Sequence, residues 1–256
     1  MLNSSDPGRR SSRLALVTGG AAGLARGVAR SLAAAGDRVA ITHRLGGTPP
    51  DAALAEIRAY DPEALSISAD FTDPAAAGVV VRELEAARGP IDVLVHAIGP
   101  IVVKRFARCT LDDYRLLLEA NLGSAVGLAF AVLPGMRERR FGRLVFFGMN
   151  GSSVTQPARG MALYGAAKAG LVTFARALAL EEAANNIAVN VIEPGDIRDK
   201  QADRRAARAQ PANNPTGHAG SWEDIAAAVR FALESEGGFL TGMVIGVNGG
   251  LTGPHE

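Results

Sequence analysis

Short apolar segments alternate with longer helical segments from residue 13 onward, and this alternation most constrains the fold. The apolar segments are bounded by Gly, Pro, Asp or Asn, which is typical of buried strands. They span 13–17, 38–42, 64–68, 91–97, 142–148, 187–192 and 243–248. The helical segments span 24–35, 51–60, 74–88, 111–140, 162–184 and 221–235. The pattern predicts an α/β fold with a single doubly wound domain, whose seven-stranded and mostly parallel sheet carries helices on both faces.

Two segments fall outside this alternation. Residues 196–220 follow the sixth apolar segment and are rich in Arg, Ala, Asn, Pro and Gly. A long loop inside a compact domain is usually a lid or a mobile segment. The segment is interpreted either as a basic lid over an acidic or phosphopantetheine-borne substrate or as a solvated amphipathic helix. Residues 1–12 are polar and turn-rich, which predicts a disordered lead-in. Residues 13–256 are predicted to form one domain.

The composition limits the size of the core, the possible partners and the expected cellular location. With 256 residues, 48% of them hydrophobic, it can bury one sizeable core. The formal net charge of +1 argues against a nucleic-acid or membrane-surface partner. No stretch approaches the roughly 20 apolar residues of a membrane-spanning helix. Cys109 is the single cysteine, so no internal disulfide is expected, and a reducing, cytoplasmic location fits.

A glycine-rich turn follows the first predicted strand and opens the first predicted helix. It reads Thr18-Gly19-Gly20-Ala21-Ala22-Gly23-Leu24-Ala25. Small residues let the backbone approach a phosphate, and the helix N-terminus supplies N–H donors. An ordinary strand-to-helix turn is the alternative, but the position after the first strand favours a dinucleotide site on a Rossmann-type sheet. The predicted contacts are Thr18, Gly19, Ala22, Gly23 and Leu24.

The end of the second predicted strand indicates which dinucleotide binds. A carboxylate there would bind the ribose hydroxyl of NAD, but this chain has Thr42, His43 and Arg44. A guanidinium can hold a 2′-phosphate by paired hydrogen bonds. Arg44 therefore favours NADPH or NADP over NADH, with an ordinary solvated arginine as the alternative.

The carboxyl ends of the third and fourth strands supply further candidate cofactor contacts. Asp70 and Phe71 are predicted to contact the adenine, because strand ends line the ligand crevice of a doubly wound sheet. A helix N-cap is the alternative for the residues that follow them. Ala97 and Gly99 are small enough to let the backbone approach the cofactor, and His96 is interpreted as structural.

Tyr164 and Lys168 are the central candidates for chemistry. The chain contains only three tyrosines and three lysines, yet these two stand four residues apart in a predicted helix. Residues at this spacing share a helix face. An ammonium there can hold a ribose and favour the ionised phenol, which would make the tyrosine a usable acid or base.

These motifs together resemble the short-chain dehydrogenase/reductase family, and within it the 3-oxoacyl carrier-protein reductase-like members. The resemblance covers about residues 13–252, and it is specific because the motifs occur in the family's order. The matching pieces are the turn over 18–25, Asp70, Asn121, Tyr164 with Lys168, Pro194-Gly195, and the segment 242–250, which has Asn248 where aspartate is usual.

The resemblance implies an activity and a set of roles. The implied activity is an NAD(P)H-dependent reduction of a carbonyl to an alcohol, or the reverse, with no metal. Tyr164 would be the acid or base, Lys168 would hold the ribose, and Asn121 would order a water chain. Pro194, Gly195 and Ile197 would contact the cofactor. Relatives associate through long helices, so a homotetramer or dimer is expected, with helices 111–140 and 162–184 as the interface.

The chain departs from the family where a serine normally donates to the substrate oxygen. Met149 stands at that position, and the loop before Tyr164 is about two residues longer than usual. A thioether cannot donate a hydrogen bond. Ser152 is the favoured catalytic substitute, an Asn150 amide is the second interpretation, and absence of any donor is the third.

Two further points follow from the departures. Asp199 stands near the family's threonine that touches the nicotinamide carboxamide. Because Met149 replaces the serine, the alternative function is an NADPH-binding protein with little or no catalysis, acting as a scaffold or a redox-responsive partner.

Overall fold

A seven-stranded sheet forms the centre of the computed structural model, which describes residues 12–234 and 237–251. The strand order is β3-β2-β1-β4-β5-β6-β7, and every pairing between neighbours is parallel. The strands are β1 (Leu14–Thr18), β2 (Arg38–His43), β3 (Leu65–Ser68), β4 (Val93–His96), β5 (Gly142–Phe147), β6 (Ile187–Pro194) and β7 (Val244–Val247). The predicted doubly wound α/β fold is confirmed. The predicted lead-in over 1–12 lies outside the described residues, apart from Ser12.

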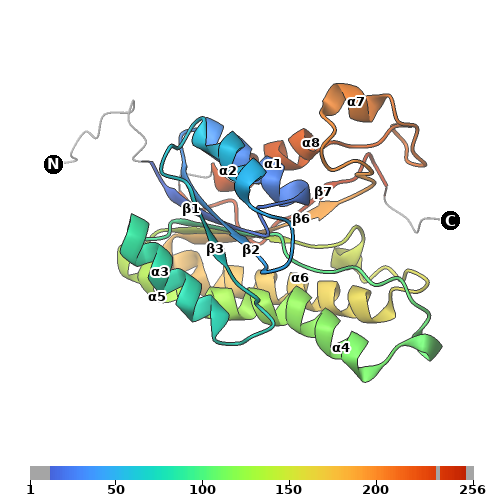
Figure 1. The fold of residues 1–256 in the computed structure, drawn as a ribbon. Coiled ribbons are helices and arrows are strands. Elements are labelled where there is room, and N and C mark those ends of the chain that lie inside the picture. Colours follow the sequence, from blue (N-terminus) through green and yellow to red (C-terminus); the bar gives the residue numbers. More distant parts are fainter. Residues whose placement is uncertain (1–11, 235–236, 252–256) are drawn as a thin grey trace.

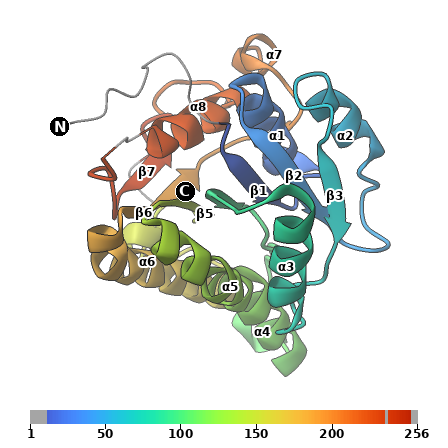
Figure 2. The same cartoon turned by 90° about the vertical axis from the view of Figure 1, so that its left-hand side faces the viewer.

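Helices cover both faces of the sheet and give a three-layer arrangement (Figures 1 and 2). One face carries α1 (Gly23–Ala34), α2 (Asp51–Arg58) and α8 (Trp222–Leu233), and the other carries α3 (Ala76–Arg88), α5 (Ser124–Arg139) and α6 (Ala162–Glu182). The other helical elements of the described residues are the helices α4 (Leu111–Leu118) and α7 (Arg204–Arg208), the 3-10 turns η1 (Phe106–Arg108), η3 (Ser152–Val154) and η4 (Ala183–Asn185), and the π-helical turn η2 (Glu119–Gly123).

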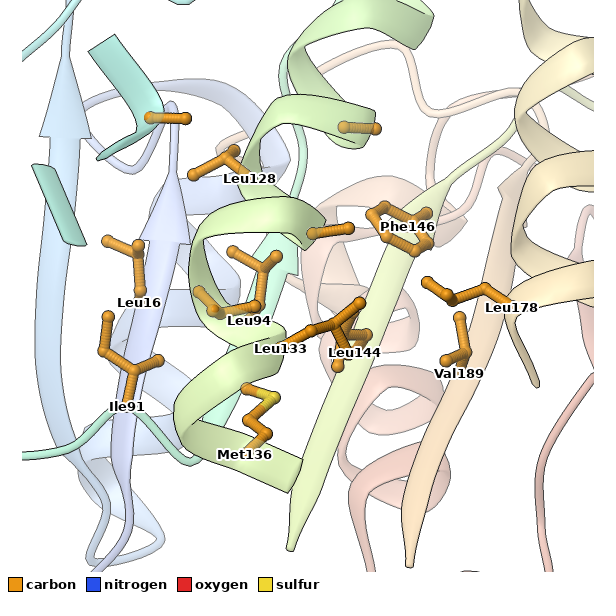
Figure 3. Close-up of a cluster of buried hydrophobic side chains, with 14 of the residues drawn as sticks. Leu16, Ile91, Leu94, Leu128, Leu133, Met136, Leu144, Phe146, Leu178 and Val189 are labelled. Carbon is orange, nitrogen blue, oxygen red and sulfur yellow. The ribbon is translucent and has the colours of Figure 1, made fainter. Parts of the chain in front are cut away.

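The core lies in two layers, one on each side of the sheet. On the α5 side, Leu94 and Leu144 from the strands meet Leu128 and Leu133 from the helix, as Figure 3 shows. A separate cluster packs the other face against α1, α2 and α8. Because the central strands are buried on both faces, their sequences are continuously apolar rather than alternating.

The predicted helix over 111–140 is interrupted at a π-helical turn, η2 (Glu119–Gly123), that separates α4 from α5. The Asn121 side chain donates Nδ2 to the Leu117 carbonyl at 3.0 Å and to the Pro100 carbonyl at 3.2 Å. A side-chain donor on a helical carbonyl competes with the backbone ladder and opens the turn. The two hydrogen bonds therefore fix the orientation of the Asn121 carboxamide, which is fully buried.

Contrary to the expectation from the sequence, two helical stretches of the described chain have the length and composition of membrane spans. They are Leu111–Arg139 and Ala162–Asn185, of whose most apolar windows 50% and 44% are buried inside the fold. The buried halves pack on the sheet as core helices do, so their apolar character is explained by this packing.

Candidate active site

Hydrogen bonds join the carboxyl ends of β1, β2 and β4 at one edge of the sheet. The Thr18 hydroxyl lies 3.0 Å from His96 Nδ1 and accepts from the Ala97 N–H at 3.2 Å. Gly19 N–H donates to the Thr42 hydroxyl at 3.2 Å. The predicted contacts in these turns thus come together, although the Thr18 side chain itself is buried and used between strands.

The glycine turn leaves the start of α1 open to a ligand. Gly19 and Gly23 have φ angles of 71° and 59°, a region that favours glycine. Ala22 is the N-cap, and it offers no side-chain hydrogen bond. The first turn of α1 also contains no acidic residue. Backbone N–H groups at such a helix start are suited to an anionic group.

A cavity of about 500 Å³ lies beside this turn and brings four predicted residues together. Its lining includes Gly19, Arg44, Asp70 and Phe71. Hydrogen bonds from the backbone and side chain of Thr72, followed by the charge of Arg44, hold the pKa of Asp70 below its ordinary value. Asp70 is therefore an ionised acceptor opposite an exposed guanidinium, in a cavity of the size that small ligands occupy.

Tyr164 and Lys168 lie buried in the first two turns of α6. Lys168 Nζ donates to the Phe147 carbonyl at 2.6 Å and lies 5.9 Å from the centre of the Tyr164 ring. Burial raises the pKa of Tyr164 to about 12 and lowers the pKa of Lys168 to about 8. The expected lowering of the tyrosine pKa by the ammonium is therefore not found, because burial of the phenol raises that pKa.

Asn121 and Lys168 converge on the backbone of Gly99. A Cβ built on Gly99 would lie 2.1 Å from Asn121 Oδ1 and 3.1 Å from Lys168 Nζ, so a larger residue does not fit. Asn121 Oδ1 is buried and has no hydrogen-bond partner among the described residues. A buried, unpaired acceptor usually marks a place for water or a ligand atom.

His96 is fully buried and hydrogen-bonded through both ring nitrogens, which agrees with its interpretation as a structural residue. The Ser124 hydroxyl donates to the Ala120 carbonyl at 2.8 Å, so His96 Nε2, 3.0 Å away, must donate to Ser124. Nδ1 is then the acceptor for Thr18. Burial first, and then the charge of Lys168, lower the pKa of His96 to about 3.

Ser152, the predicted carbonyl donor, is held by a buried carboxylate. Its hydroxyl donates to Glu193 Oε1 at 2.7 Å and accepts from the Met149 N–H at 3.2 Å. Glu193 is 4% exposed and also accepts from the Gly151 N–H and from both the N–H and the hydroxyl of Ser153. The single hydroxyl proton of Ser152 is thus directed away from a substrate in this arrangement.

Asn150 is turned toward the end of β7. Its Oδ1 accepts from Asn248 Nδ2 at 2.7 Å, and Asn248 also donates to the Leu251 carbonyl at 2.9 Å. Met149 packs on the start of α6, with Cε 3.8 Å from where a Cβ on Gly165 would lie. Among the described residues, no hydrogen bond joins any of these side chains to Tyr164.

Further predicted cofactor contacts lie at the carboxyl end of β6. The Gly195 N–H donates to the Val247 carbonyl at 2.9 Å, and a Cβ there would lie 2.5 Å from the Asn248 backbone. Pro194 precedes it, and Ile197 is buried. Glu193 was missed by the sequence analysis, and a carboxylate near the end of a largely apolar strand was the available signal.

A parallel doubly wound sheet with an open glycine turn after β1, and a buried tyrosine and lysine on α6, defines a Rossmann-type oxidoreductase. Residues 19–252 match the sequence profile of a family described as enoyl-(acyl carrier protein) reductase. The chain belongs to the short-chain dehydrogenase/reductase family.

Named relatives and solved structures agree with this membership. The chain is 35% identical over 245 residues to the 3-oxoacyl-(acyl-carrier-protein) reductase FabG of Escherichia coli, covering 93% of this chain and 97% of the relative. It is 36% identical over 249 residues to the acetoacetyl-CoA reductase of Shinella zoogloeoides, covering 93% and 98%. A blue fluorescent protein from a metagenomic library, solved in complex with NADPH, superposes with a TM-score of 0.81 at 30% identity, covering 93% and 97%.

Proposed function

We propose that the protein is an NADPH-dependent carbonyl reductase, or the reverse alcohol dehydrogenase, that works with Tyr164 as acid and base. The observation that carries the proposal is the buried convergence of Tyr164, Lys168 and Asn121 at the edge where the glycine turn opens. The named relatives act on 3-oxoacyl and acetoacetyl thioesters, which supports thioester-borne ketones as the first substrates to test.

The residues at the sheet edge fit NADPH. The open start of α1 suits the pyrophosphate, and the cavity between Arg44 and Asp70 suits a 2′-phosphorylated adenosine, since no carboxylate follows Thr42 to repel a phosphate. When bound, the cofactor supplies a hydride to the carbonyl carbon. The remaining contacts that we assign to it are Leu24, Phe71, Ala97, Gly99, Pro194, Gly195 and Ile197.

The proton side of the reaction follows from the burial of Tyr164. With a pKa of about 12, the phenol keeps its proton at neutral pH and can give it to a carbonyl oxygen that becomes an alkoxide. Lys168 holds the ribose and places an ammonium beside the phenolate that remains. Asn121 Oδ1 binds a water that restores the proton.

The donor to the substrate oxygen is assigned first to Ser152. Using it requires the serine proton to leave Glu193 Oε1, which it contacts at 2.7 Å. The Asn150 amide is the alternative, because its oxygen is bound to Asn248 while its NH₂ group has no hydrogen-bond partner among the described residues. Either group would stabilise a developing oxyanion.

We further propose a homotetramer or dimer in the cytoplasm, with no nucleic-acid or membrane partner. Phe130 on α5 and Leu180 on α6 are 76% and 83% exposed, so these two helices carry apolar side chains that a second copy would cover. The net charge of +1 supports the absence of a nucleic-acid partner.

The test is NADPH oxidation with a panel of ketones and 3-oxoacyl thioesters. Tyr164→Phe is expected to lower kcat at least about a hundredfold, because proton transfer is lost, while the dissociation constant for NADPH stays near the wild-type value. Tyr60→Phe is the matched control, since Tyr60 is 55% exposed. Activity that survives in Tyr164→Phe would refute the mechanism. Tight NADPH binding without turnover on the whole panel would favour the scaffold function instead.

A further inference from the structure

The segment that follows β6 is anchored at two points and exposed between them. Ile197 is 8% exposed and packs in the core cluster of the α1 face. Ala202 is 7% exposed, and its N–H donates to the Asp199 carbonyl at 3.2 Å. Asp203 then caps α7 by accepting from the Ala206 N–H at 2.8 Å. The four side chains at 198–201 are exposed.

Lys200 extends from this segment across the glycine turn. Its Cδ lies 3.8 Å from where a Cβ on Gly23 would be, and Gly23 is the first residue of α1. The Lys200 ammonium makes no ion pair within the described part of the chain. Its neighbour Arg198, by contrast, pairs with Asp196 at 3.0 Å. The Asp199 carboxylate accepts from the Gln201 N–H at 2.8 Å.

An anion at the start of α1 would be attracted both by the helix and by the nearby Lys200 side chain. The start of a helix carries roughly half a positive charge, and the first turn of α1 contains no acidic residue to offset it. Two neighbouring positive groups favour the binding of a doubly charged anion. On a Rossmann-type sheet, the group that sits at the start of the first helix is the pyrophosphate.

We propose that Lys200 binds the pyrophosphate of the dinucleotide and holds the 198–201 segment over it. This assignment rests on the function proposed above and adds a cofactor contact from the segment after β6. The three N–H donors of an ammonium can satisfy oxygens of both phosphates. The burial of Ile197 and Ala202 at its two ends holds the segment close to the start of α1, where this contact can form.

The experiment compares two ligands by calorimetry on the full-length protein. NADPH contains the pyrophosphate, whereas adenosine 2′-phosphate keeps the adenine and the 2′-phosphate without it. Lys200→Ala is expected to raise the dissociation constant for NADPH about tenfold and to leave that for adenosine 2′-phosphate unchanged. The salt dependence of NADPH binding should also weaken. Lys200→Arg is expected to retain most of the affinity.

Arg198→Ala is the matched control, because it removes a cation of the same segment that is already paired. It is expected to change the NADPH dissociation constant less than twofold. The assignment is overturned if Lys200→Ala binds NADPH as the wild type does, if it weakens both ligands equally, or if Arg198→Ala has the same effect. A wild-type protein that binds neither ligand would instead overturn the proposed function, and this contact with it.

Discussion

Replacing Lys168 with methionine should make the protein more stable at neutral pH while it removes catalysis. Lys168 is 3% exposed, and burial lowers its pKa from the ordinary 10.5 to about 8. Each pKa unit corresponds to about 1.4 kcal/mol, so the buried ammonium lowers the free energy of unfolding by roughly 3 kcal/mol. Loss of its hydrogen bond to the Phe147 carbonyl offsets about 1 kcal/mol. The expected net gain for Lys168→Met is about 2 kcal/mol at pH 7.

The sign of the pH dependence follows from the same two values. Below pH 8 the ammonium is protonated in both states, so the folded wild type carries the full penalty. Between pH 8 and 10.5 the unfolded chain binds the proton more tightly, so wild-type stability rises with pH relative to the variant. Above 10.5 both states are neutral and the penalty is gone. The advantage of Lys168→Met should therefore shrink across this window.

Urea unfolding followed by the fluorescence of Trp222 measures this difference. Wild type and variant are compared at pH 7, 8.5 and 10 at one protein concentration. The titration of groups that both proteins share cancels in the difference between their free energies of unfolding. Lys104→Met is the control, because Lys104 is 34% exposed and pairs with Asp113 on the surface. A variant less stable than wild type at pH 7, or a difference that does not change with pH, would refute the reasoning.

Two further predictions concern the cofactor and the carbonyl donor. Arg44→Ala is expected to raise the dissociation constant for NADPH about tenfold or more and to leave that for NADH unchanged, measured by fluorescence titration, because only NADPH carries the 2′-phosphate; equal weakening of both would contradict this role. Ser152→Ala is expected to lower kcat about a hundredfold in the steady state, as loss of an oxyanion donor does. If Asn150→Ala shows that loss and Ser152→Ala does not, the role belongs to Asn150.

Much of the fold could be predicted because hydrophobic periodicity is a local property. The second strand was predicted over 38–42 and is Arg38–His43, and the fifth was predicted over 142–148 and is Gly142–Phe147. The break at Asn121 was not predicted, because the sequence around it is apolar and helical, and only the carbonyls that its side chain reaches decide it. The short helix α7 lies in a segment whose two interpretations had been left open.

The site could be predicted as a set of positions but not as a set of bonds. Gly19, Arg44, Asp70 and Phe71 were placed at strand ends, and such ends meet at one edge of a parallel sheet. The bond from Ser152 to Glu193 joins the turn η3 to strand β6, and hydrophobic periodicity carries no information about such a contact. The pKa of Tyr164 likewise depends on burial, which the spacing to Lys168 does not reveal.

The bond between Asn150 and Asn248 has a consequence for how the molecule assembles. Its partners are 98 residues apart in sequence, and those of the Ser152–Glu193 bond are 41 apart. The bond from the Gly19 N–H to Thr42, which stabilises the glycine turn, joins residues only 23 positions apart. Because long-range contacts form more slowly, we expect a folding chain to complete the glycine turn before the loop beside Tyr164. Ordering of the glycine turn should then precede ordering of the loop beside Tyr164 during refolding, with docking of β7 as a late step.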